Sequence, residues 1–178
     1  MKKIILYMFA VTAICLCTNC NRPERDLDNP ASITIDYSQT IEQVMDSNKG
    51  LWSFDSSIIT ENSHWPAEKT GKKEILSAQL LRFPDDIRTK DAMTAIDRAG
   101  YRPGTLAELI ALGIQYPELR EKAVAAIGSD ANVSYVPCWK YDGQQCVLKM
   151  IPFDVSWESD GIMEWDESGW RFLAIPKS

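Results

Sequence analysis

Six carboxylates lie between Asp154 and Glu167, with no basic residue among them. Crowded carboxylates repel one another unless a cation or solvent relieves the charge, so a Ca²⁺ site here is physically reasonable. Ser156, Glu158, Asp160, Gly161 and Glu167 even fall at positions 1, 3, 5, 6 and 12 of an EF-hand loop, although serine at position 1 and strand-like flanks depart from that motif. A solvated acidic loop is the simpler interpretation, and we predict no metal and no cofactor.

Tryptophans are interleaved with these carboxylates. Aromatic rings stack on the C–H groups of sugars while acids accept hydrogen bonds from the hydroxyls, so this combination is typical of a sugar-binding surface. Core packing uses tryptophan as readily. The last third of the chain holds four of the six tryptophans: Trp139, Trp157, Trp165 and Trp170. The predicted ligand surface consists of Trp157, Glu158, Asp160, Trp165 and Asp166.

Catalytic chemistry has little support in the sequence. His64 is the only histidine, and no Gly-x-Ser-x-Gly motif supports a catalytic triad around it. Zinc hydrolases need two or three histidine or cysteine ligands at characteristic spacing, and none stand here. A glycosidase pair among the C-terminal carboxylates would need a deep scaffold that this length does not suggest. We therefore predict that the protein is not an enzyme.

Two cysteines flank a predicted hairpin. The segments 133–139 and 144–151 alternate like strands, and Gly143 suits the left-handed position of the turn between them. If the loop is 141–143, Cys138 lies opposite Cys146 and a disulfide is expected; a two-residue loop at 142–143 leaves the pair diagonal. Two buried thiols on one sheet face are the alternative.

The N-terminus has the pattern of an export signal. A basic start is followed by 13 apolar residues, Ile4 to Leu16, which span about 20 Å and are too short to cross a bilayer. Cys20 ends this region and resembles the cysteine of a bacterial lipobox, which becomes the lipidated first residue; Cys17 is the second choice, and simple secretion is the alternative. This predicts a lipoprotein of the bacterial envelope, on its periplasmic or cell-surface side.

Composition gives the domain plan and excludes one class of partner. Residues 1–19 are the predicted signal, 20–31 a polar, proline-containing tether, and 32–178 a single domain. Removing Lys2 and Lys3 with the signal leaves 17 basic and 25 acidic residues, a net charge of −8. No cluster of lysine and arginine interrupts that acidic balance, so nucleic acid is not an expected partner.

Hydrophobic patterns predict an α+β fold in which residues 73–178 form two short helices and an antiparallel sheet. We expect strands at 33–37, 73–83, 123–127 and 170–175, and a short helix after Ile41. Two further helices flank a Gly-Pro-Gly corner: one is capped by Thr89 and ends at Gly100, and the other has a capping box of Thr105 with Glu108 and ends at Gly113. Met93, Met150 and Met163 are expected to fill the core.

The segment from Ala92 to Leu109 resembles the helix, G-x-R-x-P-T-x-x-E, helix core of C-type-lectin-like domains. The final Arg171-Phe172-Leu173-Ala174 is similar to the last strand of that family, but the sugar-binding motifs of the family are absent. The same residues, with Ile35-Asp36-Tyr37 and 58–62, also resemble a set of uncharacterised bacterial proteins that carries no known function. The resemblance implies a fold and no activity.

Sequence alone therefore favours an anchored binding or interaction protein. A carbohydrate or another envelope protein is the expected ligand, and the membrane is a partner through the lipid. A structural subunit of an envelope complex is the alternative, and an enzyme acting on envelope polymers is a weaker one.

Overall fold

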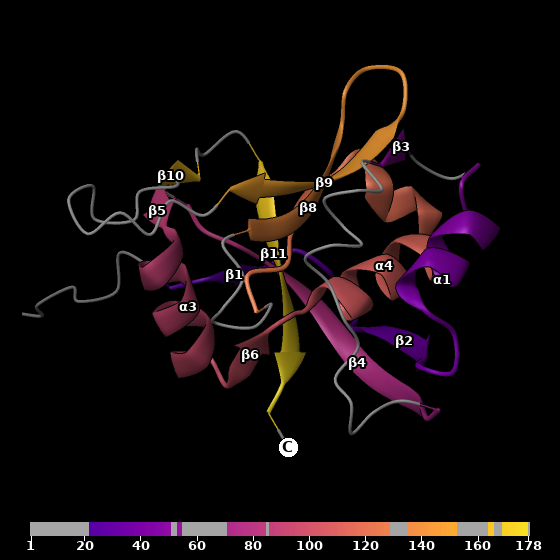
Figure 1. Ribbon diagram of the computed structural model, residues 1–178. Coiled ribbons are helices and arrows are strands. Elements are labelled where there is room, and N and C mark those ends of the chain that lie inside the picture. The colour runs from indigo at the N-terminus through magenta and orange to yellow at the C-terminus, as the bar shows by residue number, and fades with distance from the viewer. Residues whose placement is uncertain are drawn as a thin grey trace, which may run out of the picture.

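A computed structural model describes residues 22–50, 53–54, 71–84, 86–128, 135–152, 164–165 and 169–177, and within them the fold is α+β (Figure 1). Three α-helices and one 3₁₀ helix accompany a mostly antiparallel, mixed sheet in this part of the chain. The elements are β1 (Glu24–Arg25), β2 (Ala31–Asp36), α1 (Ile41–Ser47), β3 (Ser53–Phe54), β4 (Lys73–Arg82), β5 (Ile87–Arg88), α3 (Thr89–Arg98), β6 (Tyr101–Pro103), α4 (Leu106–Gln115), η2 (Pro117–Glu121), β7 (Ala123–Ala125), β8 (Tyr135–Tyr141), β9 (Cys146–Pro152), β10 (Glu164–Trp165) and β11 (Trp170–Pro176).

The C-terminal strand β11 lies inside the sheet, as the apolar end of the sequence predicts. It pairs antiparallel with β4 and β6 and parallel with β7. The main sheet has the order β1-β4-β11-β7-β8-β9-β3, with β2 on β4 and β6 on β11. The predicted α+β fold with an antiparallel sheet is confirmed in the described part of the chain, where most strand pairs are antiparallel; β11 with β7 and β3 with β9 run parallel.

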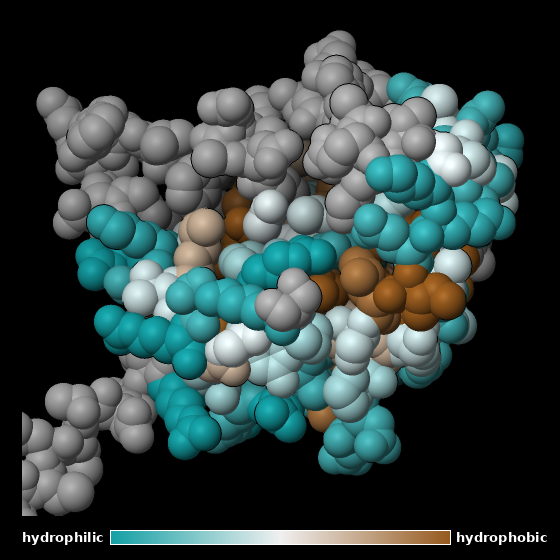
Figure 2. All heavy atoms as spheres, turned by 90° about the horizontal axis from the view of Figure 1, so that it is seen from below, coloured by the Kyte–Doolittle hydropathy of each residue, from teal (hydrophilic) through white to brown (hydrophobic). Residues whose placement is uncertain are grey.

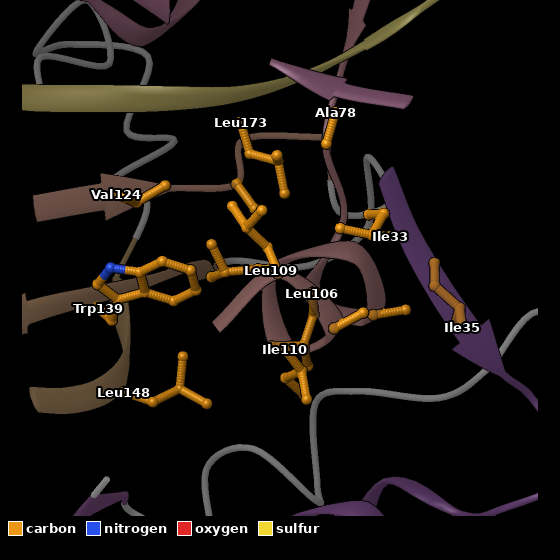
Figure 3. Packing of buried hydrophobic residues seen from close by; sticks show 14 of the residues in the cluster. Ile33, Ile35, Ala78, Leu106, Leu109, Ile110, Val124, Trp139, Leu148 and Leu173 are labelled. Atoms are coloured by element: carbon orange, nitrogen blue, oxygen red, sulfur yellow. The ribbon is translucent and has the colours of Figure 1, made fainter. Parts of the chain in front are cut away.

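Both faces of the sheet are buried, because helices cover each of them (Figure 1). Helices α1 and α4 pack on one face, where Leu109 lies near Trp139, Val124 and Leu173 (Figure 3). Helix α3 packs on the other face through Ala92 and Ile96. Successive residues of β11 alternate between the two cores, as the period of a strand requires: Phe172 joins the α3 side and Leu173 the α4 side.

Capping boxes start two of the helices. Thr40 Oγ1 accepts the Gln43 N–H before α1, and Gln43 Oε1 accepts the Thr40 N–H in return. The predicted box before α4 is confirmed. That helix runs past Gly113 to Gln115, so the predicted end is wrong. Gly113 is a buried residue within the helix and does not terminate it.

Helix α3 departs from its prediction in two details. Thr89 is its first residue and Arg88 is the N-cap, without a side-chain capping bond. Met93 is 42% exposed and is not a core residue, whereas Met150 is buried as expected. Met163 is outside the described residues.

The predicted tether is partly folded, because residues from Glu24 onward pair with the sheet. Strand β1 pairs with β4, and the Asp26 N–H donates to the Leu80 carbonyl. The buried Gln79 side chain then bonds both the N–H and the C=O of Leu27. Sequence composition indicated a tether because these long-range partners are not visible in a local window.

Side chains from the end of α4 satisfy the outer backbone groups of β2. Tyr116 Oη accepts the Ser32 N–H at 3.0 Å and donates to the Ser32 carbonyl at 3.1 Å. Gln115 accepts the Thr34 N–H at 3.0 Å and donates to the Thr34 carbonyl at 2.8 Å. Two side chains therefore occupy the positions that a further strand would take.

The β8–β9 hairpin has a longer turn than predicted. Asp142 Oδ1 accepts the N–H groups of Gln144 and Gln145, which stabilises a four-residue turn from Asp142 to Gln145. Gly143 has φ of +99°, as expected for a left-handed position. The register places Cys138 opposite Lys149 and Tyr141 opposite Cys146, so the predicted registers are wrong.

This register removes the geometric case for the Cys138–Cys146 disulfide. Relative to the register with a loop at 141–143, which would set Cys138 opposite Cys146, the pairing is shifted by three residues, and an odd shift places the two cysteines on opposite faces: Cys138 packs with the α3 core and Cys146 with the α4 core. Both are free, buried thiols. Burial raises the pKa of Cys138 to about 12 and that of Cys146 to about 11, so both stay protonated and unreactive at neutral pH.

Candidate binding groove

A groove of about 550 Å³ lies between the N-terminal segment and helix α3, and we name it the α3 groove. Leu81 of β4 and Tyr101 of β6 contribute apolar and aromatic surface to it. The remaining lining residues come from the N-terminal segment, Arg22, Pro23 and Arg25, and from α3 and its end, Asp91, Thr94, Ala95, Arg98 and Ala99. Seen from below, the side of the molecule formed by α3 is covered by hydrophilic residues (Figure 2).

Three arginines of the α3 groove are not neutralised by neighbouring acids. None of the guanidinium groups of Arg22, Arg25 and Arg98 forms an ion pair or hydrogen bond with another described residue. Arg98 lies in the last turn of α3, where its charge also offsets the helix dipole. The positive charge of the groove is therefore available to a ligand.

The carboxylates closest in sequence to these arginines already have cations of their own. Asp91 pairs with Arg88 at 2.8 Å, Glu24 with Arg82 at 3.0 Å, and Asp97 with Lys177 at 2.5 Å, while Asp26, next to Arg25, pairs with Lys122 and Arg171. A protein of net charge −6 thus keeps an excess of positive charge at one groove. A guanidinium fork matches the oxygens of a carboxylate or phosphate, so the α3 groove suits an anionic ligand.

The wall formed by β1 is fixed by an ion-pair cluster around Asp26. Lys122 Nζ lies 2.5 Å and Arg171 Nε 3.2 Å from Asp26 Oδ2, and the Asp26 side chain is 15% exposed. Burial alone would raise the pKa of Asp26, but hydrogen bonds from Lys122 and Arg171 outweigh burial and lower it. This cluster ties the N-terminal segment to β11 and to the residue before β7.

Replacing Asp26 by asparagine is expected to lower the free energy of unfolding by about 2 kcal/mol at neutral pH, since charge-assisted hydrogen bonds are lost. Because the folded pKa lies below the ordinary value of 3.8, this contribution is present above that pH and is lost as the pH falls through the folded pKa. Urea unfolding at several pH values should show the two proteins converging in acid. The exposed Asp46→Asn variant should match the parent throughout, and an Asp26 difference that does not change with pH would contradict the assignment.

The wall formed by β6 depends on an ion pair between the partly exposed Arg102 and the buried Glu108. Arg102 donates to both carboxylate oxygens of Glu108, at 2.6 and 3.1 Å, and Glu108 also accepts the Thr105 N–H at 2.8 Å. The Glu108 side chain is 1% exposed. Hydrogen bonding to Glu108 raises the pKa of Arg102, so the guanidinium remains charged. The Gly100–Thr105 segment that carries the family resemblance therefore has a structural role, joining β6 to the start of α4.

Few of the predicted site residues lie in the part of the chain that the structure describes. Cys20, Trp157, Glu158, Asp160, Asp166 and His64 lie outside the described residues. Trp165 belongs to β10, where its backbone pairs with Ile87. Trp139 is fully buried, with Nε1 donating to the Lys122 carbonyl, so it is a core residue and not part of a ligand surface. Trp170 is half-buried, with Lys140 Nζ 5.8 Å from its ring centroid.

The α3 groove was missed in the sequence because its arginines are far apart along the chain. Arg22 and Arg25 fall in the predicted tether and Arg98 stands more than seventy residues later, so no local cluster of basic residues marks the site. In the described part of the chain, no group of three or more histidine, cysteine or acidic residues could hold a metal ion. Nor does any described helix have the length and apolar character to cross a bilayer.

Comparison with models of known protein families, with curated proteins and with solved structures found no match. The resemblance to C-type-lectin-like domains therefore stays a prediction, and the site has to be interpreted from its own chemistry.

Proposed function

We propose that this chain is an exported, lipid-anchored protein of the bacterial envelope whose α3 groove binds an anionic ligand. The observation that carries the proposal is the set of three arginines without described partners around one groove of a net acidic protein. Three exposed guanidinium groups gathered around one groove are a stronger reason for ligand binding than aromatic residues alone, which pack in cores as readily.

The anchor at Cys20 places this binding function at a membrane. A carbohydrate bearing carboxylate or phosphate groups, or an acidic segment of another envelope protein, has the chemistry that the groove recognises. The predicted surface of Trp157, Glu158, Asp160, Trp165 and Asp166 remains a second candidate, for neutral sugars. The negative charge of the chain argues against nucleic acid.

The test uses the full chain purified from membranes, with inorganic phosphate and glycerol 3-phosphate as probes in calorimetry at constant ionic strength. Arg98→Gln should weaken binding about tenfold or more, because a charge-assisted hydrogen bond contributes roughly 1.5–3 kcal/mol. Lys90→Gln removes the same charge from the same helix outside the groove and should change little. Labelled palmitate should enter the parent but not Cys20→Ser. Unaltered phosphate binding by Arg98→Gln would refute the groove, and normal labelling of Cys20→Ser would refute the anchor.

A further inference from the structure

The α3 groove begins two residues after the predicted lipid attachment site. Arg22 lines the groove, and Asn21 alone separates it from Cys20. Two residues of extended chain span at most about 7 Å, so acyl chains on Cys20 would keep this end of the groove within reach of the headgroups, while the contact itself depends on the arginines. We infer, building on the proposed function, that the anion in the groove is the phosphate group of an anionic phospholipid in the membrane that holds the anchor.

Charge distribution supports a single orientation on that membrane. The chain left after removal of the predicted signal has a net negative charge, which anionic headgroups repel, whereas they attract Arg22, Arg25 and Arg98. Each basic residue near such a surface contributes about a fivefold factor in affinity, so the three together contribute about a hundredfold. The domain therefore turns the α3 groove to the bilayer.

This orientation directs the opposite side of the domain away from the membrane. Helices α3 and α1 cover opposite faces of the sheet and lie at opposite sides of the molecule (Figure 1). Thr94 is exposed and lines the groove, while Ser47 is exposed at the end of α1. A probe at residue 94 should lie near headgroups, and a probe at residue 47 should remain in water.

The experiment attaches a fluorophore to Thr94→Cys or Ser47→Cys in the full chain purified from membranes. Cys138 and Cys146 are buried and should not react. The protein is reconstituted in vesicles of phosphatidylcholine alone or with phosphatidylglycerol, each holding a headgroup-linked quencher. We expect quenching at residue 94 to exceed that at residue 47 at least twofold, but only with phosphatidylglycerol. Replacing Arg22, Arg25 and Arg98 together by glutamine should abolish this difference.

The outcomes separate this inference from the function on which it rests. Equal quenching at both positions, combined with binding of soluble glycerol 3-phosphate, overturns the membrane inference and assigns the groove to a soluble ligand. Equal quenching without soluble binding overturns both. A preference for residue 94 that survives the triple substitution also overturns the inference, because the orientation would then not depend on the groove.

Discussion

Arg102→Met is expected to lower the free energy of unfolding by about 3–5 kcal/mol, because it leaves a fully buried carboxylate without its cation. Glu108 is 1% exposed and receives two hydrogen bonds from Arg102. Methionine retains most of the apolar volume of the arginine stem, so the loss reports mainly the unpaired charge. Urea unfolding followed by tryptophan fluorescence measures the effect.

A second substitution makes this prediction specific. In Arg102→Met with Glu108→Gln, the neutral amide can still accept the Thr105 N–H, so most of the lost stability should return. The matched control is Arg98→Met, whose guanidinium has no partner among the described residues; its effect should stay within about 0.5 kcal/mol. Arg102→Met with near-parental stability, or no recovery in the double variant, would show that the pair is not what holds β6 to α4.

Gly128→Ala should destabilise the protein by about 3 kcal/mol, the upper part of the range for overpacking. A Cβ atom there would lie 2.4 Å from the Pro103 carbonyl oxygen and 2.8 Å from that of Gly104. Both obstacles are backbone atoms, so they cannot move aside by a change of rotamer. The Gly128 N–H also donates to the Gly104 carbonyl at 2.9 Å, and this bond would be displaced as well.

Thermal unfolding of Gly128→Ala alongside Gly50→Ala tests this contact. No atom lies within 4 Å of a Cβ built on Gly50, and its φ is not in the left-handed region. Gly50→Ala should therefore be neutral or slightly stabilising, since alanine reduces the entropy of the unfolded chain. Equal melting temperatures for the two variants would mean that the 100–104 and 128 backbones separate without cost.

Features specified by local sequence were predictable. The apolar run that became β11, the capping box at Thr105 and the long strand β4 depend on residues close together in the chain, where periodicity and capping chemistry act. The hairpin was located, but its register was not, because Asp142 accepts two backbone N–H groups and lengthens the turn. That single difference reversed the face of Cys138 relative to Cys146.

Features created by long-range contact were not predictable from the sequence. Asp26 meets Arg171, 145 residues later, and this pairing changes a predicted tether into part of the fold. The α3 groove has the same origin, because only the folded sheet brings Arg22 and Arg25 beside Arg98. The surface predicted from carboxylates and tryptophans belongs to the segment 157–166 of the sequence. The arginines without described partners line the α3 groove instead.

The hydrogen bonds from Gln115 and Tyr116 to β2 couple helix order to self-association. If the proposed anchor holds these molecules in one membrane, they meet at high local concentration, and an open strand edge would let neighbouring chains join into a continuous sheet. Here both blocking side chains come from the last residue of α4 and the residue after it. Fraying of that single helical turn would release four backbone groups of β2 at once, so the order of the final turn of α4 controls whether this strand edge is open to pairing.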